Sequence, residues 1–360
     1  MTPSKIRGVN LGSLFIIEPW MVGDTWGKMG CGGKASEFDC MMVLGQEAGD
    51  AAFQKHWSTF ITEADFDEMV SYGINTVRIP IGYWMYEKLV YTDSEHFPRG
   101  GFEYLRKVAS WAKSRQIFVV LVLHGAPGAQ ATSNAFTGQN ANPAGFYQQY
   151  QYDRGIEFLE WITEMIYTYS GDFDHVFMLE VLNEPLQWGA APATLRSYFY
   201  EKAFAAIREK EHMLGITENE SLHIQFMNSL WGAGNPVEDI NPHYWAAFDD
   251  HRYLKWVPKD QLTVSKEDYI KTSCNDNRQA EGENPTIVGE FSLSVADEVE
   301  RTADWSVDND PDFYKSWFAA QIKSYEKATN GWIFWSWKTE LGDARWDYKR
   351  EYFPHMSIKV

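Results

Sequence analysis

Short apolar runs alternate along the chain with longer segments in which apolar residues recur every three or four positions. The short runs are typical of strands, and the recurring apolar residues are typical of amphipathic helices. Most of the runs are almost continuously apolar, as parallel strands covered on both faces are. We predict eight strands, at Ile6–Leu11, Thr76–Pro80, Phe118–Leu123, Val176–Leu182, Leu222–Met227, Trp245–His251, Thr286–Gly289 and Gly331–Trp337.

Helical spacing fills the segments between these strands. Residues 62–65 resemble a capping box, with Asp65 where Glu or Gln is usual, and Gly73 indicates the end of that helix. The same spacing predicts helices near residues 105–112, 158–166 and 314–325. Eight strands with intervening helices predict an α/β fold, a (β/α)8 TIM barrel with extended βα loops, in one domain over residues 1–360. An open doubly wound sheet fits less well, because no Gly-rich dinucleotide fingerprint follows the first strand.

Polar or aromatic residues stand at or near the carboxyl ends of all the predicted strands. In a barrel of this kind these strand ends form the mouth, where catalytic residues lie. Selection for solubility alone would not place such groups there, so the pattern predicts an enzyme. In strand order the residues are Asn10 or the nearby Glu18, Arg78, His124, Asn183 with Glu184, Asn228, His251 with Tyr253, Glu290, and Trp337 with Lys338.

Two of these residues, Glu184 and Glu290, predict the chemistry. Strands four and seven lie across the barrel mouth from each other, so the two carboxyl groups can converge. Hydrolysis of a glycoside uses one protonated carboxyl group for the leaving oxygen and one ionised carboxylate, with about 5–5.5 Å between them for retention and a wider gap for inversion. Because two close carboxylates do not both ionise easily, we expect Glu290 to be held as the anion. The candidates to stabilise it are Arg78, His251 and Tyr253.

Each of these residues also has an ordinary structural interpretation. A single glutamate at a strand end is more often a helix cap or an ion-pair partner, but two of them at strands four and seven favour catalysis. His124 and His251 could be structural or could bind a metal. Because no His-x-His or His-Glu-x-x-His spacing occurs, we predict neither a metal nor another cofactor. Residues 125–128 lack the Gly-Lys-Ser/Thr ending of a phosphate-binding loop, so we predict a turn there.

Aromatic residues make up 16% of the chain, which includes 16 Trp. Such residues fill cores, and the rings of Trp and Tyr also stack on the apolar faces of sugars. On the eighth predicted strand Trp332, Trp335 and Trp337 alternate, so part of this set must belong to the core. Trp337 is nearest the carboxyl end, and we predict that it forms a platform beneath the reacting sugar.

The formal net charge is −18 over 360 residues. An acidic surface repels nucleic acid and anionic lipid, and no basic stripe interrupts it, so we expect neither as a partner. No segment approaches the roughly 18 uncharged apolar residues that a membrane helix needs. These features suit a neutral substrate, although acidity alone fits many proteins.

The first residues contain no apolar signal core, so we expect either a cytosolic protein or a mature form whose signal has been removed. Cys31 and Cys40 bracket a Gly-rich loop and could close a disulfide, whereas Cys274 could instead pair with one of them. Their spacing matches no zinc motif. Asn219 begins a sequon, which is a glycosylation acceptor if the chain is secreted.

Leu-Asn-Glu-Pro at 182–185 and Val-Gly-Glu at 288–290 resemble the two catalytic motifs of glycoside hydrolase family 5 in clan A. The resemblance runs over essentially the whole chain, because other segments look like those of fungal exo-β-1,3-glucanases and their relatives. These segments are Arg-Gly-Val-Asn-Leu-Gly at 7–12, Glu-Pro-Trp at 18–20, Val-Arg-Ile-Pro-Ile-Gly-Tyr-Trp at 77–84, Leu-His-Gly-Ala-Pro-Gly at 123–128 and Trp-Ile-Phe-Trp-Ser-Trp-Lys-Thr-Glu at 332–340.

Two branches of that family compete. The exo-β-1,3 branch usually continues its His-Gly-Ala-Pro-Gly stretch with Ser-Gln-Asn-Gly, and this chain does not. Other segments resemble the fungal endo-β-1,6-glucanases of subfamily 15, namely Gly-Cys-Gly-Gly at 30–33, Ser-Glu-Phe-Asp-Cys at 36–40, Gly-Ala-Gln at 128–130, Phe-Thr-Gly-Gln at 136–139 and Ser-Leu-Trp-Gly at 229–232. The resemblance therefore implies a secreted, monomeric endo-β-1,6-glucanase that acts on β-glucan polysaccharide or oligosaccharide. The alternatives are an exo-β-1,3-glucanase, a β-glucan transglycosylase and a non-catalytic glucan-binding barrel, although the last would be expected to lack one catalytic carboxylate.

The resemblance also implies a role for each matching residue. Glu184 would be the acid/base and Glu290 the nucleophile of a retaining double displacement. At 250–253 the chain has Asp-His-Arg-Tyr, where the exo enzymes usually carry additional histidines, but the core His-x-Tyr is kept. The other implied roles are Asn183 binding the sugar 2-hydroxyl, Arg78 and Tyr253 holding the nucleophile, His124 and His251 lining the reacting subsite, Trp337 forming its floor and Glu18 binding hydroxyls of that sugar.

Overall fold

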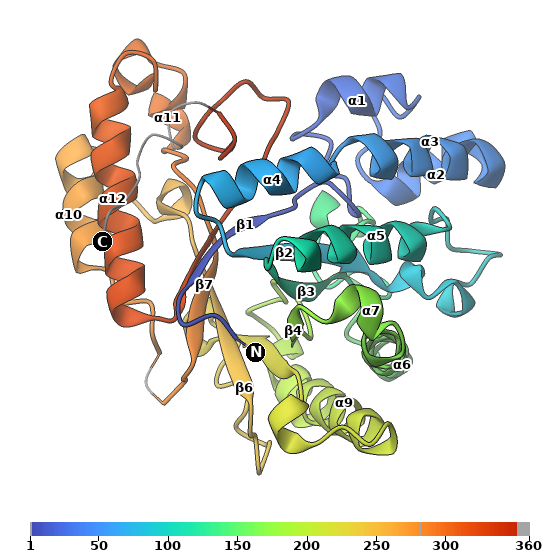
Figure 1. The fold of residues 1–360 in the computed structure, drawn as a ribbon. Coiled ribbons are helices and arrows are strands. Elements are labelled where there is room, and N and C mark those ends of the chain that lie inside the picture. The colour runs from blue at the N-terminus through green and yellow to red at the C-terminus, as the bar shows by residue number, and fades with distance from the viewer. Residues whose placement is uncertain (1, 281, 351–360) are drawn as a thin grey trace.

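The computed structural model describes residues 2–280 and 282–350. Its strands form a closed parallel barrel in which β1 to β8 follow one another in sequence order, and β8 pairs with β1. Figure 1 shows the helices arranged around the outside of the strands. The strands are β1 Ile6–Asn10, β2 Thr76–Gly82, β3 Phe118–Gly125, β4 Val176–Glu180, β5 His223–Met227, β6 Ala246–Arg252, β7 Thr286–Phe291 and β8 Gly331–Phe334.

The predicted (β/α)8 barrel is thus confirmed, and each predicted strand is present. Two strands end at least two residues earlier than predicted: β4 stops at Glu180 and not at Leu182, and β8 stops at Phe334 and not at Trp337. The loops after these two strands therefore begin deeper inside the barrel than the apolar pattern of the sequence indicated. The predicted domain over 1–360 also includes residues 1, 281 and 351–360, which lie outside the described residues.

The helices include those expected from the spacing. Before α4, Thr62 N donates to Asp65 Oδ2 over 2.8 Å, which is the reciprocal half of the predicted capping box. The helices predicted near 105–112, 158–166 and 314–325 lie within α5, α6 and α12. The α-helices are α1 Gly23–Lys28, α2 Glu37–Leu44, α3 Gln46–Thr59, α4 Glu63–Ser71, α5 Gly101–Ser114, α6 Gln149–Thr168, α7 Ser170–Phe173, α8 Ala191–Thr194, α9 Glu201–Met213, α10 Lys266–Asn275, α11 Asp297–Glu300 and α12 Pro311–Ala328.

Successive side chains of each strand point to opposite faces of the barrel wall, so the hydrophobic core has two parts. Outward-facing residues pack against the helices in one large cluster, and inward-facing residues such as Val120, Ala247 and Ile333 form a smaller separate cluster. The smaller cluster fills the barrel interior with apolar side chains. Further along the strands, the buried residues Arg78 and Glu180 replace these apolar groups, so charge enters the barrel below its mouth.

The segment between β1 and β2 carries the first four helices, and Figure 1 shows α2 and α3 side by side at the edge of the barrel. A disulfide joins Cys31 to Cys40, with 5.0 Å between their Cα atoms, and so ties the preceding loop to α2. Cys274 is a free, exposed cysteine, so the pairing that the sequence left open is the local one.

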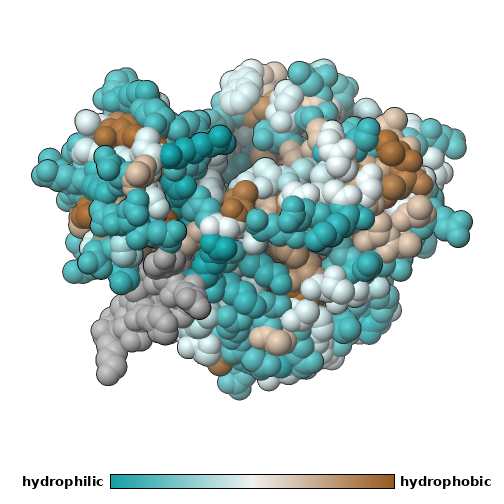
Figure 2. Space-filling view, turned by 90° about the horizontal axis from the view of Figure 1, so that it is seen from above, coloured by the Kyte–Doolittle hydropathy of each residue, from teal (hydrophilic) through white to brown (hydrophobic). Residues whose placement is uncertain are grey.

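The visible surface is mostly hydrophilic. Hydrophilic side chains cover most of the face in Figure 2, and hydrophobic ones occur in small separate groups. Among the residues that the structure describes, no helix has the length and hydrophobicity that crossing a bilayer would require.

Candidate active site

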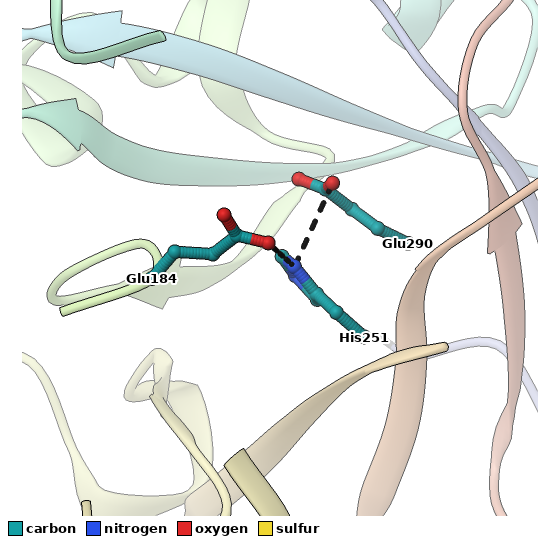
Figure 3. A group of neighbouring side chains, drawn as sticks. All are labelled: Glu184, His251 and Glu290. Atoms are coloured by element: carbon teal, nitrogen blue, oxygen red, sulfur yellow. Dashed lines mark hydrogen bonds and ion pairs between the residues drawn. The ribbon is translucent and has the colours of Figure 1, made fainter. Parts of the chain in front are cut away.

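The two predicted catalytic glutamates meet in a cavity of about 890 Å³. Glu290 belongs to β7, and Glu184 follows β4 in a turn where its backbone φ is 40°. A non-glycine residue in this left-handed region is strained by roughly 1–2 kcal/mol. The Glu184 side chain departs from this strained backbone and reaches the cavity. Glu184 and Glu290 both line it. Figure 3 shows these carboxyl groups close together beside the ring of His251 from β6.

The spacing of the two carboxyl groups indicates the stereochemistry of the reaction. One carboxyl oxygen of Glu184 lies within 4.8 Å of one carboxyl oxygen of Glu290. Inverting enzymes keep about 6.5–9.5 Å between the two groups to leave room for water, and retaining enzymes keep about 5–5.5 Å. The spacing therefore favours direct attack by a carboxylate and retention. The convergence is as expected, and the individual catalytic roles stay predictions.

Glu290 is held by donors on both of its oxygens. Arg78 Nη1 donates to Oε1 over 2.8 Å, and the Tyr253 hydroxyl donates to Oε2 over 2.8 Å. Burial raises the pKa of Glu290, while the charges of His251 and Arg78 and the hydrogen bond from Tyr253 oppose that rise. An ionised carboxylate accepts hydrogen bonds at both of its oxygens, as Glu290 does here. A nucleophile requires this ionised form.

Removing the Tyr253 hydroxyl should change the pH profile in a defined direction. Its hydrogen bond lowers the pKa of Glu290, so Tyr253→Phe should raise that pKa further. Because activity requires Glu290 to be ionised, the acidic limb of kcat/KM should move to higher pH. The measurement is kcat/KM against pH, with Tyr150→Phe, an exposed tyrosine, as the matched control. An acidic limb that stays in place or moves to lower pH would contradict this account of Tyr253.

His251 lies between the two catalytic carboxyl groups. Its Nδ1 is 2.6 Å from Glu184 Oε1 and 3.6 Å from Glu290 Oε2, and its Nε2 is 3.4 Å from Asp249 Oδ2. Burial alone would lower the pKa of His251, but Glu290, Asp249 and Glu184 together raise it well above its ordinary value. The ring is therefore an imidazolium that donates to Glu184 and adds positive charge beside the nucleophile.

A buried layer of charge supports these groups from below. Arg78 donates from Nε and Nη2 to Glu180 Oε2, over 3.0 and 2.8 Å, and lies 3.5 Å from Asp249 Oδ2. Burial raises the pKa of Glu180, whereas His251 and Arg78 outweigh burial at Asp249 and lower its pKa. Arg78 thus faces the carboxyl groups of both Glu180 and Asp249 in this buried layer. Sequence analysis missed both residues, because each lay inside a predicted strand and not at its end, although β4 in fact ends at Glu180.

Asn183 is placed to bind substrate. Its Oδ1 accepts a hydrogen bond from Arg78 Nη2 over 2.8 Å, which fixes the orientation of the amide. Within the part of the chain that the structure describes, its buried Nδ2 has no hydrogen-bond partner, and the residue lines the cavity. An oriented but unpaired amide donor at this place suits a sugar hydroxyl, and the substrate-binding role of Asn183 stays a prediction.

The floor of the cavity is formed by Trp335, and the prediction of Trp337 was wrong. Trp337 is completely buried, and its Nε1 donates to Asp65 Oδ1 over 2.9 Å, away from the cavity lining. Trp335 lines the cavity and stacks on His124, with 5.8 Å between the ring centroids and 10° between the planes. The physical reason is that β8 ends at Phe334, so strand alternation does not continue to Trp337.

Glu18 lines the same cavity from the loop after β1, as expected. Trp20 Nε1 donates to Glu18 Oε2 over 2.8 Å. Burial raises the pKa of Glu18 to about 8, with help from the charges of Glu290 and Glu184 and against the hydrogen bond from Trp20. A carboxyl group that is easily protonated can both donate to and accept from sugar hydroxyls.

The rim of the cavity is aromatic, and sequence analysis did not identify its members. Trp188 and Trp256 are 65% and 61% exposed, so much of each side chain is open to contact with a ligand. Trp231 Nε1 donates to the carbonyl of Pro185 over 2.9 Å, and Trp346 packs edge-on against Trp20. All five tryptophans line the cavity. The high Trp content was the available signal, but these residues lie in loops where no periodicity marks them.

Glu184, His251 and Glu290 form a group of possible metal ligands among the described residues. The imidazolium state of His251 argues against this use, because its Nδ1 carries a proton and offers no lone pair. The guanidinium of Arg78, 2.8 Å from Glu290, also repels a cation. The expectation of no metal and no other cofactor stays a prediction.

The sequence and the fold of this chain are similar to those of known proteins. A family model described as Cellulase (glycosyl hydrolase family 5) matches residues 43–341. The chain is 54% identical over 345 residues to "Glucan endo-1,6-beta-glucosidase B" of Emericella nidulans, covering 96% of this chain and 83% of that protein. It is 30% identical over 375 residues to "Probable glucan 1,3-beta-glucosidase A" of Aspergillus fumigatus, covering 95% and 84%. Among solved structures, the rutinosidase from Aspergillus niger has a TM-score of 0.74 and 20% identity over 97% of this chain and 98% of that one, which shows a shared fold.

Proposed function

The chain belongs to glycosyl hydrolase family 5 and is a glycoside hydrolase, and from this premise we propose that it is a retaining endo-β-1,6-glucanase. The observation that carries the linkage is the 54% identity to an enzyme named glucan endo-1,6-beta-glucosidase, against 30% to one named for 1,3 linkages. The observation that carries retention is the distance within 4.8 Å between oxygens of the two carboxyl groups.

In the first step Glu290 attacks the anomeric carbon. The bond from that carbon to the glycosidic oxygen breaks, and Glu184 gives its proton to the departing oxygen. A covalent ester between the sugar and Glu290 results. The hydrogen bonds from Arg78 and Tyr253 hold the carboxylate in place before attack.

In the second step Glu184 acts as a base. It takes a proton from a water molecule, whose oxygen attacks the anomeric carbon and releases Glu290 as a carboxylate. Two displacements return the original anomeric configuration, and Glu184 regains its proton. His251 stays hydrogen-bonded to Glu184 at 2.6 Å, so the same group is oriented for both proton transfers.

Endo action on a polymer fits the exposed rim. Trp188 and Trp256 are exposed in the cavity lining and offer stacking surfaces to further glucose units of a polymer. A cavity lined mainly by aromatic and hydrogen-bonding groups suits a neutral polysaccharide such as β-1,6-glucan or its gentio-oligosaccharides.

The test of linkage and mode is digestion of pustulan, a β-1,6-glucan, beside laminarin, a β-1,3-glucan. Short oligomers should appear early from pustulan, with little release from laminarin. Release of glucose alone from laminarin would refute the proposal and favour the exo-β-1,3 alternative. The Glu290→Ala protein, prepared in the same way, controls for contaminating hydrolases.

We further propose that the enzyme is secreted, acts as a monomer and degrades cell-wall glucan. The disulfide between Cys31 and Cys40 supports an oxidising compartment, where such bonds persist. The sequon residue Asn219 is exposed and accessible to glycosylation. Glycosylated protein in the culture medium that elutes as a monomer would agree with this proposal, and retention inside the cell would contradict it.

A further inference from the structure

Glu37 is a buried carboxyl group that the reaction does not use. It is completely buried at the start of α2, and burial raises its pKa well above the ordinary value. Its Oε1 accepts a hydrogen bond from Ile17 N over 2.7 Å, and within the described residues its buried Oε2 has no partner. A buried carboxyl group with one hydrogen bond is costly to the fold, so its position calls for a reason.

The residue that donates a hydrogen bond to Glu37 lies directly before Glu18. Ile17 is the residue preceding Glu18, so the Glu37 hydrogen bond fixes the Ile16–Ile17 peptide, one peptide before the one that leads into Glu18. The next peptide is fixed as well, because Glu18 N donates to Ser13 Oγ over 3.1 Å. The Ser13 carbonyl is in turn 2.7 Å from Nε2 of His56 on α3. The β1 loop is thus anchored to α2 and α3 on the side away from the cavity.

Helix α2 also contacts the loop after β3. Phe38 N donates to the carbonyl of Gly138 over 3.0 Å. This loop brings Phe136 into the cavity lining, where its ring lies 5.5 Å from that of His124. The first turn of α2 therefore supports two loops that line the same part of the cavity.

The position of α2 is itself fixed by a covalent bond. The Cys31–Cys40 disulfide joins the helix, three residues after Glu37, to the loop that precedes it. The Ser36 side chain caps its first turn by accepting from Asp39 N. Residues 31–40 thus form a stapled segment outside the part of the chain that the family model matches.

We propose that Glu37 is a positioning residue for Glu18, holding the β1 loop so that the Glu18 carboxyl group faces the hydroxyls of the reacting sugar. The Cys31–Cys40 disulfide keeps α2 in the place from which Glu37 reaches Ile17. This inference rests on the proposed function, because it assigns Glu18 to the subsite in which Glu184 and Glu290 act.

A double-mutant cycle with Glu18 tests the inference. Glu37→Met removes the acceptor and should lower kcat/KM on pustulan by about tenfold, the size of one lost hydrogen bond. Glu37→Gln keeps a carbonyl oxygen for Ile17 N and should stay within about twofold of the wild type. In a Glu18→Ala background Glu37→Met should have no further effect, because the residue through which it acts is absent. Glu47→Met, an exposed glutamate on α3, is the control.

Two results overturn the inference. One is a tenfold loss from Glu37→Met in both backgrounds, which indicates general disruption, and the other is no loss in either background. If Glu37→Met does not fold, as judged by thermal unfolding, the double variant Cys31→Ser with Cys40→Ser takes its place in the same cycle, with the same two outcomes. Wild-type protein active on laminarin and not on pustulan would refute only the linkage, and the cycle would then be measured on laminarin.

Discussion

Replacing Glu290 by alanine should lower kcat/KM on pustulan by about four orders of magnitude. The variant lacks the carboxylate that we assign to attack on the anomeric carbon. Azide should restore part of the activity, because the small anion fits the space left by the side chain and attacks from the same face. The product should then be an α-glycosyl azide, since a single displacement inverts the configuration.

The control for this experiment is Glu267→Gln, an exposed glutamate on α10, which should keep full activity. Thermal unfolding of both variants checks that the loss does not come from instability. Recovery of a β-glycosyl azide from Glu290→Ala would assign the nucleophile to another residue, and near-normal activity without azide would remove Glu290 from the mechanism.

Replacing Glu184 by glutamine should lower kcat/KM on pustulan by about 10²–10⁴-fold, the usual contribution of a general acid. The loss in the first step should depend on the leaving group. A dinitrophenyl glycoside needs no protonation to depart, so its covalent intermediate should form at nearly the wild-type rate and then accumulate. A burst of dinitrophenol followed by slow turnover, measured by stopped-flow, is the expected signature.

Variants of Glu184 should give a different azide product from variants of Glu290. Azide added to Glu184→Ala should give a β-glycosyl azide, because the anion attacks the covalent intermediate. The position tolerates replacement, since the Glu184 side chain is 19% exposed and contacts mainly His251. Equal losses on pustulan and on the dinitrophenyl glycoside would contradict its assignment as the acid/base.

The barrel could be predicted from the sequence because strands that are buried on both faces consist of almost continuous apolar residues. Residues 118–123 of β3 are apolar throughout, and the helix of residues 101–114 has the matching spacing. The catalytic pair could be predicted for a related reason. Glu184 and Glu290 interrupt or follow such runs, and the order of the strands then places them across the barrel mouth.

The rest of the site depends on contacts between residues far apart in the sequence. Glu180 looks like a single acid in an apolar strand and Asp249 like one of two adjacent acids, and only the closed barrel shows that both lie beside Arg78. Trp337 was misplaced because the end of β8 depends on pairing with its neighbours and not on its own composition. The support that Glu37 gives to Ile17 joins a helix to a loop through one backbone hydrogen bond, for which no sequence pattern exists.

The backbone of Glu184 has a consequence for how this enzyme can change over generations. Its φ of 40° is comfortable for glycine and strained for glutamate, so a drift to glycine would stabilise the fold while abolishing proton transfer. Selection for a robust fold and selection for catalysis therefore oppose each other at this single codon. A descendant freed from the need to hydrolyse glucan would be expected to lose this glutamate early and to keep the barrel.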